Sequence, residues 1–148
     1  MKRLIFLIFC ISSLTTGVAA QVAAIAHKSV PIESITSSKL FEYYSGETRL
    51  WDNGQPVVVF DLEPKNAVKD AFYEFMGKST SRMKSIWMVN MLLGEGDPPE
   101  SLKSEEEMLT KVASTSGAIG FVSQSTVTED VKVLAVIGME KGKSNFLD

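Results

Sequence analysis

Short apolar runs typical of buried β-strands alternate with helical patterns along most of this 148-residue chain. The apolar runs cover residues 21–27, 57–60, 117–122 and 131–137. Helix-start signals follow the first two runs, at residues 35–38 and 63–66, and two more occur at residues 79–81 and 104–107. Strands that alternate with helices form βαβ units. The alternation therefore predicts an α/β fold: a mostly parallel sheet with helices on both faces.

The first twenty residues have the pattern of a secretory signal peptide. Lys2 and Arg3 precede an apolar run over residues 4–14, and small residues close the segment at 18–20. The apolar run is shorter than the roughly 20 residues that a membrane-spanning helix needs. A cleaved signal is therefore favoured, and an uncleaved N-terminal anchor stays as the alternative.

Cleavage after Ala20 predicts a periplasmic protein with one domain over residues 21–148, ending in a polar tail from about residue 138. The whole chain has 15 basic and 18 acidic residues, and without Lys2 and Arg3 only 13 basic ones remain. This acidic balance argues against nucleic acid as a partner. The rest of the chain has no other long apolar stretch, so we expect no insertion into the membrane after cleavage.

The mature chain has few residues suited to catalysis or metal binding. Its single histidine is His27, and the one cysteine, Cys10, lies within the predicted signal peptide. These counts exclude a cysteine nucleophile and a zinc site of the cysteine type. We therefore expect no enzyme activity, no metal and no cofactor.

A candidate ligand site lies where a helix begins after the predicted strand at residues 57–60. Lys65, Asn66 and Ala67 occupy this start, at the kind of crevice where doubly wound sheets bind ligands. Backbone N–H groups at a helix start can bind an anion. The alternative is a turn in which Asn66 is an ordinary N-cap residue.

Two other features have both a functional and a structural interpretation. Ser37 and Ser38 begin another helix and could bind a ligand, although serine is common there as a cap. The stretch at residues 86–93 is apolar almost all round. A helix of this kind is either deeply buried or carries a contact surface, and methionine next to Trp87 suits an adaptable interface.

The order of several short motifs resembles the phosphate-type periplasmic substrate-binding proteins of ABC transporters. The motifs are Ile35-Thr36, Tyr44-Ser45-Gly46-Glu47, Trp51, and Ser-Gly-Ala-Ile-Gly-Phe-Val at residues 116–122. The resemblance extends over residues 21–136. It implies one lobe of the type II periplasmic-binding-protein fold, since full members have two lobes and about twice this length.

The chain departs from the family at the segment that the resemblance assigns to anion binding. The family has an Arg followed by Ser-Gly-Thr, whereas residues 60–67 contain neither. Asp61 and Glu63 bring negative charge there instead. Each would cost an anion about 5 Å away on the order of 3 kcal/mol at an effective dielectric constant near 20. Lys65 could offset one of these two charges.

The resemblance implies a non-catalytic binding protein, with phosphate or another small oxyanion as a weakly bound ligand. An ABC permease is the implied transport partner. A single lobe forms one wall of a cleft, so a homodimer or another envelope protein could supply the second wall. The alternative is a protein–protein interaction module of the cell envelope that kept the fold and lost the ligand.

Overall fold

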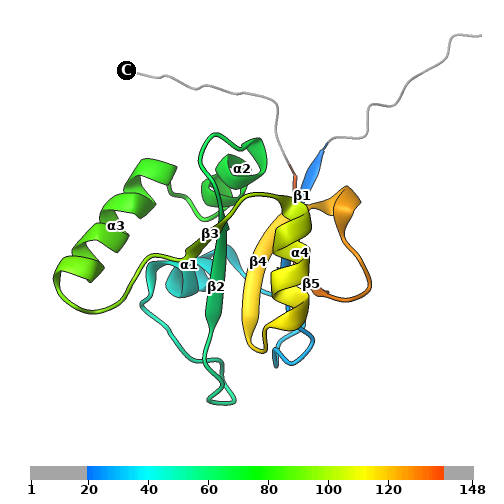
Figure 1. Ribbon diagram of the computed structural model, residues 1–148, viewed down its shortest axis with the longest axis horizontal. Coiled ribbons are helices and arrows are strands. Elements are labelled where there is room, and N and C mark those ends of the chain that lie inside the picture. The colour runs from blue at the N-terminus through cyan, green and yellow to red at the C-terminus, as the bar shows by residue number, and fades with distance from the viewer. Residues whose placement is uncertain (1–19, 139–148) are drawn as a thin grey trace, which may run out of the picture.

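The computed structural model describes residues 20–138, so the predicted tail and all but Ala20 of the predicted signal peptide lie outside the described residues (Figure 1). The strands are β1 (Gln21–Ala26), β2 (Val58–Leu62), β3 (Glu100–Leu102), β4 (Ala118–Ser123) and β5 (Lys132–Gly138). The helices are α1 (Ser37–Ser45), α2 (Ala67–Phe75), α3 (Thr80–Leu92), α4 (Glu105–Ser114) and the short 3₁₀ turn η1 (Gln124–Thr126).

The five strands form one mixed sheet in the order β3-β2-β4-β1-β5. β2 is parallel to β3 and β4, whereas β1 is antiparallel to both of its neighbours, β4 and β5. The α/β fold with helices on both faces is confirmed, but the prediction of a mostly parallel sheet is wrong in this respect. Helical crossovers make β2, β3 and β4 parallel. They do not determine the direction of β1, which pairs only with strands from the far end of the chain.

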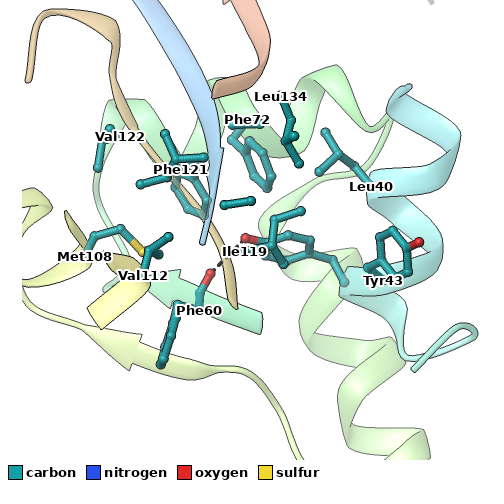
Figure 2. Close-up of a cluster of buried hydrophobic side chains, with 14 of the residues drawn as sticks. Leu40, Tyr43, Phe60, Phe72, Met108, Val112, Ile119, Phe121, Val122 and Leu134 are labelled. Carbon is teal, nitrogen blue, oxygen red and sulfur yellow. Dashed lines mark hydrogen bonds between the residues drawn. The ribbon is translucent and has the colours of Figure 1, made fainter. Parts of the chain in front are cut away.

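Adjacent residues of β4 point to opposite faces of the sheet and contact different helices. Phe121 stacks on Phe72 of α2, with ring centroids 4.1 Å apart. Gly120 faces α4, because a Cβ atom at this position would meet Met108 and Val112. Figure 2 shows these side chains on the two sides of β4. The sheet is therefore covered by α2 on one face and by α4 on the other.

The predicted helix starts are confirmed by the side chains that cap them. Thr36, Asn66, Ser79 and Ser104 each accept a hydrogen bond from a backbone N–H group in the first turn of α1, α2, α3 and α4 respectively. Such caps satisfy N–H groups that have no partner within the helix. Local sequence therefore determines where these helices begin.

Trp51 connects the loop before β2 to the start of β4. The side chain is only 2% exposed, and its Nε1 donates a hydrogen bond to the carbonyl oxygen of Gly117 over 2.9 Å. Gly117 has a φ of +76°, and a Cβ atom there would collide with the carbonyl oxygen of Pro56. This close approach of the loop to β4 requires glycine at position 117.

We predict that Gly117→Ala lowers the free energy of unfolding by about 2–4 kcal/mol, because strain at positive φ adds to a clash with rigid backbone. Gly54→Ala is the matched control. Gly54 also has positive φ, but open space surrounds its missing Cβ, so we expect a loss of about 1 kcal/mol. Urea unfolding of both variants measures the difference, and equal losses would contradict the clash.

Candidate functional site

A buried ion pair occupies the carboxyl end of β2. Asp61 is 2% exposed, and its carboxylate accepts hydrogen bonds from Lys69 Nζ over 2.9 Å and from the Tyr73 hydroxyl over 2.5 Å. The backbone N–H of Leu62 donates to the same carboxylate over 2.9 Å. Lys69 Nζ also donates to the carbonyl oxygen of Leu62. We call Asp61, Lys69 and Tyr73 the Asp61 cluster.

The protonation of Tyr73 supports this arrangement. Burial raises the pKa of the Tyr73 hydroxyl well above its usual value, and the nearby Asp61 carboxylate raises this pKa further. The hydroxyl therefore keeps its proton and remains a donor to Asp61. Lys69 brings a positive charge into direct contact with Asp61, so the negative charge of this carboxylate is compensated inside the protein.

Sequence reasoning did not identify Lys69 and Tyr73 as the partners of Asp61. The available signal was their spacing of four residues, which places both side chains on one face of α2. That spacing does not reveal which strand this face covers. The docking of α2 against the sheet, which includes the stacking of Phe72 on Phe121 of β4, supplies the missing information.

Lys65, Asn66 and Ala67 lie together at the start of α2, as expected. Asn66 Oδ1 accepts hydrogen bonds from the N–H groups of Val68 over 2.9 Å and of Lys69 over 3.4 Å. The cap therefore already engages two N–H groups of the first turn. The side chains of Lys65 and Ala67 are exposed, and Lys65 has a φ of +63°.

The structure does not bring Ser37 and Ser38 to this helix start. Both residues line a hollow with Phe75 and Gly77, at the carboxyl end of α2. Residues 65–67 lie at the other end of this nine-residue helix, about 13 Å away at the usual rise per residue. The five candidate residues therefore form two separate groups, and ligand binding by either group stays a prediction.

The apolar helix α3 is fixed to α1 by its inner side. Trp87 Nε1 donates to the carbonyl oxygen of Tyr44 over 2.7 Å, and Asn90 Nδ2 donates to that of Ser45 over 2.7 Å. Met83 and Trp87 are buried. These two hydrogen bonds satisfy carbonyl groups in the last turn of α1, which otherwise lack helical partners.

The other side of α3 carries exposed large apolar side chains. They are Met88 (51% exposed), Val89 (52%), Met91 (47%), Leu92 (79%) and the C-cap residue Leu93 (65%). We call these five residues the α3 outer face. Figure 1 shows α3 at the opposite end of the molecule from β5. The inner side of this helix is therefore core and its outer side is exposed, and a contact through the outer side stays a prediction.

A hollow of about 390 Å³ lies between α1, β2, α3 and the loop before β3. Arg49 and Asn90 are among its lining residues, but both side chains already bond to backbone carbonyl groups of residues 45 and 46. These bonds use the amide nitrogen of Asn90 and one of the five N–H donors of Arg49.

The residues that the structure describes contain no group of three His, Cys, Asp or Glu side chains that could hold a metal ion. His27 lies at the carboxyl end of β1, where its Nδ1 is 3.0 Å from the backbone nitrogen of Ser29. Within residues 20–138, no helix is both long and apolar enough to cross a membrane.

The fold is that of one lobe of the phosphate-binding proteins. An ABC-type phosphate transport receptor from Vibrio cholerae matches 78% of this chain, with 21% identity and a TM-score of 0.62. A putative phosphate ABC transporter substrate-binding protein with bound phosphate from Clostridium perfringens matches 78%, with 22% identity and a TM-score of 0.65. PstS from Borrelia burgdorferi matches 79%, with 15% identity and a TM-score of 0.58.

This chain spans less than half the length of these structures, covering 45%, 45% and 47% of them respectively. No protein-family model and no curated protein matches it. At these identities the similarity establishes the fold. The α/β lobe expected from the sequence motifs is therefore confirmed, while the ligand must be argued from this chain's own residues.

We predict that Lys69→Met lowers the free energy of unfolding by about 3–5 kcal/mol, because it leaves the Asp61 carboxylate buried without its positive partner. Adding Asp61→Asn should recover part of this loss, since the double variant buries no charge. Urea unfolding measures both variants. A Lys69→Met protein as stable as the wild type would show that the ion pair is not buried as described.

Proposed function

We propose that this chain is a non-catalytic binding protein of the cell envelope that engages a protein partner. Residues 1–20 would direct it to the periplasm. The observation that carries the proposal is the α3 outer face, where five large apolar side chains remain between 47% and 79% exposed. A concentration of large exposed apolar side chains on one short segment supports an interaction surface, whereas single exposed apolar residues are ordinary.

The anchoring of α3 supports this proposal. The hydrogen bonds of Trp87 and Asn90 to α1 fix one side of the helix, so rotation to bury the outer face would break them. Covering an apolar side chain contributes about 1.5–3 kcal/mol when burial is complete. A partner that covers Met88 and Leu92 would therefore gain affinity without a change in the lobe.

The Asp61 cluster supports a role other than enclosing phosphate. It fills the carboxyl end of β2 with an internally satisfied ion pair, in the segment that the resemblance assigns to anion binding. Lys69, the cation of this cluster, is 4% exposed and already bonded to two oxygen atoms. The similar structures are described as transport receptors and substrate-binding proteins, which supports a role without catalysis.

A second candidate function is weak binding of phosphate or another oxyanion at the start of α2, with an ABC permease as the transport partner. Two observations favour it. Lys65 and Ala67 are exposed at this helix start, and the similar Clostridium perfringens structure holds phosphate. A single lobe presents one wall to such an anion, so water would compete for its hydrogen bonds.

We predict that a photo-crosslinking amino acid at Met88 or Leu92 gives a light-dependent protein adduct when the full chain is expressed in its host cells. The matched control carries the same amino acid at Glu106, an exposed position of α4, and should give none. Gel electrophoresis and mass spectrometry detect the adducts. Absence of adducts at all three positions, or equal adducts at the α3 and α4 positions, would contradict the proposal.

For the second candidate, we predict that phosphate or sulfate raises the melting temperature of the mature protein at low salt. At 100 times the dissociation constant, one bound anion adds about 2.7 kcal/mol, which shifts the melting temperature by several degrees. Lys65→Ala should reduce the shift. Ser38→Ala should not, because Ser38 belongs to α1 and lies near the carboxyl end of α2. Lack of any shift would exclude the second candidate and leave the protein-binding proposal standing.

A further inference from the structure

A groove runs between α2 and the end of the last strand, β5. Its volume is about 480 Å³, which is in the range of ligand-binding clefts. Two of its apolar side chains are open to solvent, since Val136 is 49% exposed and Phe75 is 36% exposed. The walls include Asp70, Glu74 and Phe75 from α2, and Val136, Ile137 and Gly138 from β5.

The same groove borders an open edge of the sheet. β5 is the last strand on its side and pairs only with β1. The carbonyl oxygen of Leu134 accepts a hydrogen bond from the N–H of Ile35, so the loop before α1 covers the first half of this edge. Among the described residues, no strand covers residues 135–138 on this side. Such an edge presents backbone groups that can pair with a further strand.

The residues that follow β5 in the sequence, 139–148, contain the turn that a hairpin requires. Three-residue hairpin loops are commonly a type I turn followed by a residue in the left-handed region, where glycine is favoured. The segment Glu140-Lys141-Gly142 fits such a loop, with Gly142 in the third position. This loop would place Met139 opposite Lys143, and the chain would return antiparallel along the open edge of β5.

The register set by this loop places apolar side chains opposite each other. Phe146 lies opposite Val136, and Leu147 lies opposite Ala135. Because opposite residues share one face of the sheet and lie close together, Phe146 would cover the exposed side chain of Val136. Pairing would stop beyond Ala135, since the loop before α1 already bonds to the next residue. Residues 144–147 therefore match the open half of the edge.

Charge matches the groove in the same register. Asp70 and Glu74 line the groove, and neither forms an ion pair within the described part of the chain. Ile137 lines the groove as well and is only 5% exposed, so this face of β5 points toward α2. Alternation places Met139 on the same face. Lys143, opposite Met139, would therefore face the two carboxylates, and opposite charges attract at this range.

We propose that residues 143–147 form a sixth strand, which pairs antiparallel with the end of β5 and fills the groove beside α2. The segment is joined to β5 by a short loop, so its effective concentration is high and weak contacts can hold it. The strand closes an edge that could otherwise pair with another chain. This inference is independent of the proposed function, because the α3 outer face lies at the opposite end of the molecule from β5 (Figure 1).

Hydrogen exchange of backbone amides, measured by NMR on the mature protein, tests this inference. We expect alternate amides within residues 143–147 to exchange at least about tenfold more slowly than in a free peptide of residues 139–148, because the strand must open first. Gly142→Val should remove this protection, since a β-branched residue rarely adopts the left-handed conformation. Gly142→Asn is the matched control and should keep most of the protection, because asparagine tolerates that conformation.

Three results would overturn the sixth strand. The first is exchange of residues 143–147 at the rate of the free peptide. The second is equal protection in Gly142→Val and Gly142→Asn. The third is protection that grows with protein concentration, because the segment would then pair with another molecule. Crosslinking at Met88 should be the same in Gly142→Val as in the wild type, so loss of the sixth strand would leave the proposed function intact.

Discussion

The buried ion pair between Asp61 and Lys69 is the interaction on which the arrangement of this lobe depends. Each charge is nearly inaccessible to solvent, so neither can be left without the other. The pair holds the first half of α2 against the end of β2, and this places Phe72 where it stacks on Phe121 of β4. Tyr44 of α1 packs against Phe72 in turn, so the face of the sheet that α2 covers is built outward from one polar contact.

Helix α1 fixes the position of α3. Its last carbonyl groups receive Trp87 and Asn90, which fix the orientation of α3 and leave the α3 outer face uncovered. Tyr73 of the neighbouring Asp61 cluster packs against Trp87, and this cluster uses its own cation internally. A lobe with a satisfied strand end and an open apolar helix is better suited to bind a protein surface than to surround a small anion.

Local signals allowed much of the fold to be predicted from sequence, and non-local contacts account for the rest. Helix starts were predictable because Asn66, Ser79 and Ser104 act on N–H groups two or three residues away. The direction of β1 was not, because its neighbours come from the far end of the chain. β3 was missed because its three residues include only one apolar side chain. The sequence could not show which side of α3 is buried, because the hydrogen bond from Trp87 to Tyr44 determines it.

The most direct test of this account is one series of amide NMR spectra of the mature protein, recorded with an extract of the host cell envelope and then with added phosphate. We expect the extract to shift or broaden the amide signals of Met88 and Leu92, while phosphate leaves those of Lys65 and Ala67 unchanged. Unchanged α3 signals together with saturable phosphate shifts at Lys65 and Ala67 would contradict the proposed function, and would identify the start of α2 as the binding site of this lobe.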